Sequence, residues 1–133
     1  MTSFSLKIVT PDGMEFEGNA EELIVRTTTG DIGILAGHIN CVAPLGMGQA
    51  TIVIDGKHRY AACIGGMLLV TDGMAHVVAS AFEWADEIDV ARAEKSKAAC
   101  EQALAENPTE EQAKVHEAKI RRCNLRLSVA KKA

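Results

Sequence analysis

The chain has 133 residues, of which 47% are hydrophobic and 24% charged, the composition of an ordinary globular protein that can bury a core without disulfides or metals. It contains no apolar run of the roughly 18 residues that a membrane-spanning helix needs, and its four cysteines are too scattered for a disulfide scaffold or a zinc site. Residues 1–87 carry a net charge of −7 and residues 88–133 carry +3, a division that excludes a nucleic-acid footprint and suggests two parts with different partners.

Residues 4–83 have the pattern of short β-strands. Runs rich in Val and Ile are separated by turn signals at Asp55-Gly56 and Asp72-Gly73, and each of these turns is flanked by two strand-like segments. The strands follow one another at about 8–12-residue spacing with no helical segment between them. This spacing predicts a β-sandwich or a flattened barrel.

The pattern changes after Trp84. Residues 88–106 and 109–132 are rich in Ala, Glu, Lys, Leu and Arg, which are good helix formers. Such residues also solvate helix faces, which by itself explains the basic balance of this half equally well. The two helices are separated only by a break at Pro108, so they are expected to form an antiparallel hairpin.

Two helix starts carry capping signals. Asp89 stands where the N-cap of the first helix is expected. Thr109, with Gln112 three residues later, predicts a capping box at the start of the second helix. The sequence therefore predicts an α+β protein, with an N-terminal antiparallel β-sandwich over residues 1–84 and a C-terminal helical hairpin over residues 85–133.

The second helix has two apolar stripes at helical spacing, which implies two packing partners or one wide core face. The residues of the first stripe are Ala113, His116, Ile120, Cys123, Leu127 and Ala130, and those of the second are Val115, Ala118, Leu125 and Val129.

No catalytic pattern is present. The sequence lacks the P-loop, the G-x-S-x-G nucleophile motif and the H-E-x-x-H zinc motif. The pairs His38 with Cys41 and His58 with Cys63 stand alone on strand-like sequence, where a structural role is the better interpretation. We therefore expect a protein that is not an enzyme, with no catalytic residue and no metal site.

One cluster of charges stands out. Folding the helices about residues 107–108 places Asp89 opposite Arg126, and Arg92 opposite Arg122 or Cys123. Three guanidinium groups around one carboxylate leave an excess of positive charge, which a bound anion or the acidic β-part would neutralise. A salt-bridge network explains the same cluster equally well. Its acidic members would be Glu83, Asp86, Glu87 and Asp89.

Five segments occur in a characteristic order along the chain: 6–13 (LKIVTPDG), 29–38 (TGDIGILAGH), 65–70 (GGMLLV), 85–93 (ADEIDVARA) and 122–130 (RCNLRLSVA). Together they resemble the epsilon subunit of F-type ATP synthases, called delta in mitochondria, over essentially the whole chain. Ala36 and Asn40 depart from the family pattern, which usually has proline at these places. A loop without these prolines is expected to be less rigid.

The resemblance implies a non-catalytic subunit of the central stalk, or rotor, of a proton-translocating ATP synthase. Its β-sandwich would dock on the gamma subunit and the membrane ring of c subunits. Its helical hairpin would be regulatory: when extended, it would contact the alpha and beta subunits and inhibit ATP hydrolysis. The protein would be peripheral to the membrane, on the cytoplasmic face of the bacterial inner membrane.

The resemblance also implies site residues. It places subunit contacts at Gly30, Gly33, Gly37 and His38. It requires no cofactor but suggests ATP as a regulatory ligand. The residues implied for nucleotide binding are Glu83, Ile88, Asp89, Arg92, Ala93, Arg122 and Arg126.

An alternative function uses the same arginine cluster. The chain would then be a free-standing module that binds a nucleotide or a similar anion. Co-purification with an ATPase would distinguish a rotor subunit from such a module.

Overall fold

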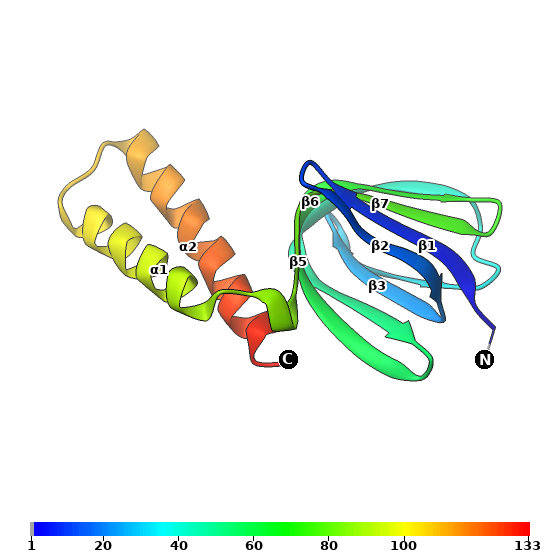
Figure 1. The fold of residues 1–133 in the computed structure, drawn as a ribbon. Helices are drawn as coiled ribbons and strands as arrows, with labels where there is room; N and C mark the ends of the chain where they lie inside the picture. Colours follow the sequence, from blue (N-terminus) through cyan, green and yellow to red (C-terminus); the bar gives the residue numbers. More distant parts are fainter. Residues whose placement is uncertain (1) are drawn as a thin grey trace. The chain divides into compact units, whose positions relative to one another are not determined.

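The computed structural model describes residues 2–133 and divides into two compact units, Met1–Trp84 and Ala85–Ala133. The first unit consists of β-strands and the second of helices (Figure 1). No helix in the described range has the length and apolar character needed to cross a membrane.

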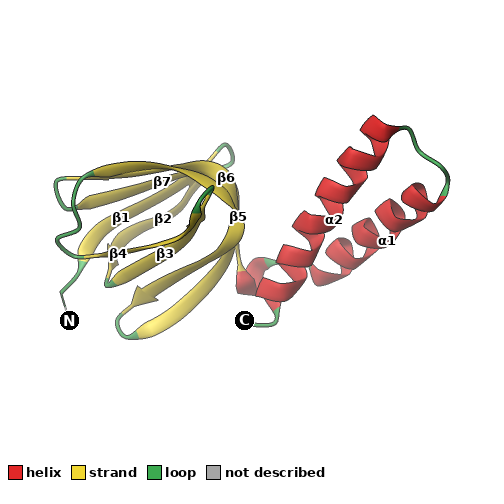
Figure 2. Cartoon of the chain, turned by 180° about the vertical axis from the view of Figure 1, so that it is seen from behind, coloured by secondary structure: helices red, strands yellow, loops and turns green. Residues whose placement is uncertain are grey.

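The first unit is one seven-stranded sheet with the order β2-β1-β7-β6-β5-β3-β4, folded over itself into a sandwich-like domain (Figure 2). The predicted α+β fold class is confirmed. The strands are β1 (Phe4–Thr10), β2 (Gly13–Ala20), β3 (Glu22–Thr27), β4 (Gly30–Leu35), β5 (Cys41–Ile54), β6 (Lys57–Thr71) and β7 (Met74–Trp84).

The strand ladders are antiparallel with one exception. β1, the first strand of the unit, lies beside β7, the last strand, and the two pair in parallel (Figure 1). The prediction of an antiparallel sandwich needs this correction. Hairpin signals reveal only neighbouring strands, whereas this ladder joins segments about seventy residues apart, such as Leu6 and Ala75.

The hydrophobic core of this unit runs from Phe4 to Trp84. Alternate residues of each strand point inward, as in β6, where Leu68 and Val70 are buried while Met67 and Leu69 are exposed. Burial of these apolar side chains stabilises the unit by roughly 25 cal/mol per Å² removed from water.

Gly66 allows β6 and β7 to approach closely. Its φ is 115°, and a Cβ atom at this position would overlap the carbonyl oxygen of Val78. The ladder continues in the same register on both sides, from Ile64 opposite Ala81 to Gly66 opposite Ala79. Only glycine satisfies both the backbone conformation and the contact.

The second unit contains a short 3₁₀ helix, η1 (Ala85–Glu87), followed by α1 (Val90–Ala105) and α2 (Glu110–Ala130). The two long helices pack against each other as an antiparallel hairpin (Figure 2). α1 begins two residues later than its composition predicts, because Asp89 caps it instead of belonging to it.

Both predicted caps are confirmed. Oδ1 of Asp89 accepts a hydrogen bond from the backbone N–H of Arg92 at 3.0 Å. At the start of α2, the Thr109 hydroxyl accepts from Gln112 N at 3.2 Å, and Gln112 Oε1 accepts from Thr109 N at 3.1 Å. These bonds satisfy backbone donors that a helix start leaves open.

Few side chains of the two helices are fully buried, and most of them are small. These are Ala93 and Cys100 of α1 and Cys123 of α2, with the larger Val129 of α2 buried as well. Nδ1 of His116 is also buried and has no hydrogen-bond partner in residues 2–133. A buried nitrogen without a partner costs about 1–3 kcal/mol, so the seam between the two helices stabilises the hairpin less than an apolar one would.

Because its core closes at Trp84, the β-unit should fold without the helices. We predict that residues 1–87 unfold cooperatively in urea, followed by tryptophan fluorescence. Leu68→Ala removes a fully buried side chain and should lower the free energy of unfolding by about 2–5 kcal/mol, equally in the fragment and in the full chain. A fragment with a broad, non-cooperative transition would contradict two independent units.

Candidate functional site

The first candidate surface consists of β4 and the loop that follows it, residues 30–40. Gly30 is the first residue of β4 and has a φ of 129°, and Gly37 has a φ of 83°. Both are backbone conformations that residues other than glycine rarely adopt. A Cβ atom at Gly33 would meet no other atom within 4 Å, so this glycine lies in open space. His38 is half-buried, and its Nδ1 donates to the carbonyl of Ile39 at 2.7 Å. The sequence-predicted contact residues thus share one exposed segment of the β-unit.

Exposed apolar side chains accompany this segment. The side chain of Ile39 is 77% exposed, that of Leu35 51% and that of Met74 45%. Leu35, His38 and Met74 line one shallow depression in the surface, together with Gly37 and Gly73. Large apolar side chains left exposed near one another mark an interaction site.

A second group of exposed apolar residues covers the outer face of β5, β6 and β7. Met67 stands opposite Val78, and Val42 stands opposite Leu69, so the four side chains are neighbours across three strands. All four are more than 40% exposed. The sequence interpretation missed this face. The sequence contains a signal for it in residues 67–70, four consecutive apolar residues. Such a run places apolar side chains on both faces of its strand, which is typical of a strand that is covered on both sides.

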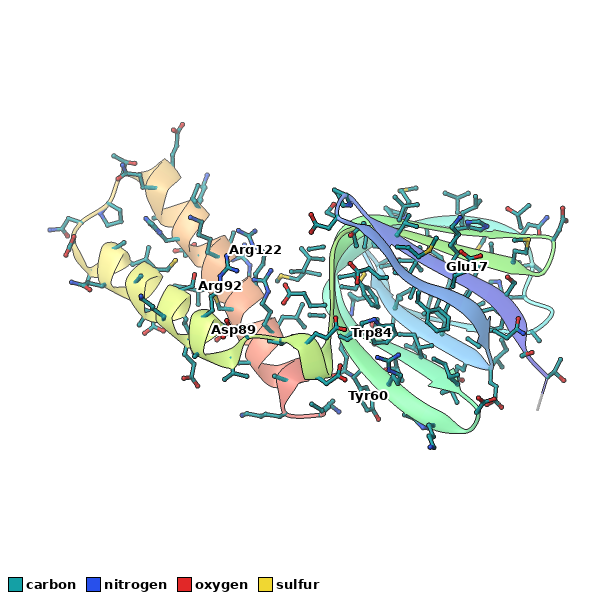
Figure 3. The ribbon with its side chains drawn as sticks, viewed as in Figure 1. Glu17, Tyr60, Trp84, Asp89, Arg92 and Arg122 are labelled. Carbon is teal, nitrogen blue, oxygen red and sulfur yellow. The ribbon has the colours of Figure 1, made fainter. Side chains whose placement is uncertain are left out.

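The second candidate site lies at the start of α1 and on the facing part of α2. Figure 3 shows Asp89 just before α1, Arg92 on α1 and Arg122 on α2. Arg92 precedes the buried Ala93, and Arg122 precedes the buried Cys123. Ala93 and Cys123 face the other helix. In two antiparallel helices, the residues directly before such inward-facing positions lie on the same side of the hairpin, so the guanidinium groups of Arg92 and Arg122 share one face.

These two arginines have no ion-pair partner in the described chain. Ion pairs form elsewhere in the described chain, for example between Arg26 and Asp31 at 2.7 Å and between Lys114 and Glu110 at 3.8 Å. Asp89 uses one carboxylate oxygen for the backbone of Arg92 and forms no recorded pair with its guanidinium. Two like charges on one face without counter-ions repel each other, which favours binding of an anion between them.

The other predicted nucleotide contacts have different surroundings. Ile88 and Ala93 are buried side chains, and Arg126 is half-buried. Glu83 is half-buried on β7, where it stands opposite Ala62 of β6. Glu83 therefore belongs to the first unit, and the other predicted residues belong to the second.

No group of three His, Cys, Asp or Glu side chains in residues 2–133 could hold a metal ion. The four cysteines are free thiols. Burial raises the pKa of the Cys63 thiol to about 11, so this group stays protonated at neutral pH and is a poor nucleophile. The ring of His58 stacks on Tyr60.

Comparison with protein families decides the assignment. Residues 3–85 match the model described as the ATP synthase delta/epsilon chain β-sandwich domain. The chain belongs to this family. The resemblance found in the sequence is thereby confirmed.

Relatives in the family match the helical unit as well as the β-unit. The ATP synthase epsilon chain of Ruminococcus albus is 44% identical over 133 residues, which is 99% of each chain. That of Caldanaerobacter subterraneus subsp. tengcongensis is 37% identical over 131 residues, covering 98% of this chain and 95% of the relative.

Solved structures share the fold. A chain in the mitochondrial ATP synthase of Euglena gracilis (OSCP, F1 and c-ring) has a TM-score of 0.70 at 22% identity, with 98% of this chain and 79% of that chain covered. A chain in the central stalk and c-ring of Tetrahymena thermophila mitochondrial ATP synthase has a TM-score of 0.66 at 13% identity, with 95% of each covered. At these identities the likeness shows the fold alone.

Proposed function

We propose that this chain is a non-catalytic subunit of the central stalk of a bacterial F-type ATP synthase. The observation that carries the proposal is the match to epsilon chains over nearly the full length of both proteins. The exposed apolar side chains of the β-unit add support, because such surfaces are normally covered in an assembly. In this role the protein is peripheral to the membrane, on its cytoplasmic face.

The β-unit docks on the rotor. Its contact surface includes Gly30, Gly33, Gly37 and His38, with the exposed Leu35 and Ile39 among them. The partners are the gamma subunit and the ring of c subunits. The apolar outer face of β5, β6 and β7 extends this surface, and burial of its side chains supplies the free energy of docking.

The helical hairpin regulates the complex. Its seam contains small residues and the unpartnered Nδ1 of His116, so separation of the helices costs little. When it is extended, its basic residues meet acidic surfaces of the alpha and beta subunits and slow ATP hydrolysis. A hairpin that changes state in this way needs only a small free-energy difference between the two states.

ATP is the ligand that favours the folded hairpin. The paired face of Arg92 and Arg122 supplies charge for the phosphates, and Arg126 adds to it. Asp89 or the backbone beside it accepts from the adenine amino group, next to Ile88 and Ala93. Glu83 is the remaining residue of the proposed nucleotide contacts. Because ATP binds the closed pair of helices, it shifts the hairpin towards its non-inhibitory state.

One feature limits the affinity. Residues 98–100 are Ala-Ala-Cys, so α1 offers no second arginine for the phosphates beside Arg92. Lys95 or Lys97 would have to supply this further positive charge. Loss of one charge-assisted contact costs about 1.5–3 kcal/mol, roughly a ten- to hundredfold loss of affinity. Weak binding is therefore expected.

Docking can be tested by charge insertion. We expect His38→Asp to weaken reassembly with an ATP synthase depleted of this subunit, because a new carboxylate is placed in the apolar contact. Lys57→Glu, at the first position of β6 and opposite Ile54 at the far end of β5, should reassemble normally. Equal effects of the two variants, measured by co-sedimentation with the complex, would count against this contact surface.

Regulation can be tested in the assembled complex. Deletion of residues 88–133 should leave assembly intact and raise the rate of ATP hydrolysis. Arg122→Glu combined with Arg126→Glu should have the same effect, because the reversed charges repel an acidic target. The exposed Arg121 provides the matched control, Arg121→Glu. Hydrolysis unchanged by both the deletion and the double variant would remove the inhibitory role.

ATP binding can be measured by calorimetry on the full chain. We expect heat of binding at millimolar ATP, and a loss of about tenfold or more in affinity for Arg92→Ala and for Arg122→Ala. Arg121→Ala should bind as the natural chain does. Asp89→Asn keeps the helix cap, since asparagine caps as well as aspartate, and so it isolates the effect of the carboxylate charge. An absence of heat, or equal binding by all variants, would contradict the proposal.

A further inference from the structure

The segment between β4 and β5, residues 36–40, has few internal contacts. Its backbone bond, from His38 N to Leu35 O at 3.1 Å, and the ring bond of His38 to the carbonyl of Ile39 are both local. Ile39 buries little surface, because 77% of it remains exposed. The segment contains no proline, and Gly37 adds backbone freedom. Something else must therefore fix its position.

The side chain of Asn40 supplies a long-range contact. Its Oδ1 accepts a hydrogen bond from the backbone N–H of Asp72 at 2.9 Å, across 32 residues of sequence. Asp72 and Gly73 form the two-residue turn between β6 and β7, which the pair Thr71 and Met74 closes. The donor is thus held by a regular hairpin.

The bond lies just beyond the end of a strand ladder. Cys41 stands opposite Val70 as the first pair between β5 and β6. Asn40 is one residue before this pair and Asp72 is two residues after it. The hydrogen bond from the Asp72 amide to the Asn40 side chain therefore extends the pairing of β5 and β6 into the two loops beyond their ends.

We propose that Asn40 is a positioning residue, which holds residues 36–40 against the β6–β7 turn and so shapes the end of the β-unit for docking. The two segments it joins carry the apolar residues of that end, Ile39 on one side and Met74 on the other, and both line or flank the depression formed with Leu35 and His38. The partner it fits is an apolar protein surface of the rotor. This inference rests on the proposed docking function.

The hydrogen bond can be measured directly in the full chain. The exchange rate of the Asp72 amide hydrogen, followed by NMR, should increase about tenfold in Asn40→Ala, since loss of one hydrogen bond is worth about this factor. Asn40→Asp keeps an acceptor oxygen and should restore the slow rate. Asn19→Ala, on an exposed position of β2, is the matched control and should change nothing. Equal Asp72 exchange in Asn40→Ala and the natural chain would overturn the proposal.

Docking is then measured with the same variants, by co-sedimentation with ATP synthase depleted of this subunit. We expect Asn40→Ala to weaken docking several-fold, Asn40→Asp to restore it, and Ile39→Asp to lower it further. If Ile39→Asp weakens docking but Asn40→Ala does not, Asn40 has no positioning role. If neither Ile39→Asp nor His38→Asp weakens docking, the proposed docking surface is wrong, whatever the exchange rate of Asp72.

Discussion

The packing of Trp84 decides how this chain is organised. Its ring meets Phe82 and Phe16 edge to face, with centroids 5.1 and 6.2 Å apart, and the guanidinium carbon of Arg59 lies 3.8 Å from the ring centroid. The indole N–H donates to the carbonyl of Glu15 at 3.4 Å. Aromatic and cation–π contacts of this kind close the hydrophobic core at the last residue of the β-unit. The chain that follows has to stabilise itself with its own contacts.

The two units therefore differ in how strongly they are held. The β-unit buries large aliphatic residues from every part of its sheet, whereas the two helices bury Ala93, Cys100, Cys123 and a single aliphatic residue, Val129, beside the unpartnered nitrogen of His116. Removal of a methylene from water is worth about 0.8 kcal/mol, so small seam residues contribute little. A well-packed β-unit joined to a weakly held pair of helices suits the proposed role, in which the β-unit stays attached while the hairpin changes state.

The features predicted well from the sequence are those that local chemistry determines. Asp89 and Thr109 act as caps because capping depends on residues within one helical turn. The parallel pairing of β1 with β7 and the bond from Asn40 to Asp72 could not be predicted, because each joins segments that are distant in the sequence. Asn40 was expected to loosen its loop by replacing a proline. The structure adds that its side chain makes a bond that no proline can make.

The cap formed by Asp89 is compatible with its proposed contact to a nucleotide. Its Oδ1 caps α1, and a carboxylate has a second oxygen with further capacity to accept. The cap orders the first turn of α1, which contains Arg92. Asp89, which would accept from the adenine amino group, therefore also helps to position the guanidinium of Arg92, which would bind the phosphates. The open N–H groups of that turn add positive potential, which favours an anion. The carboxylate opposes part of this potential, so in the proposed site the affinity for ATP would depend on the arginines of both helices and therefore on closure of the hairpin.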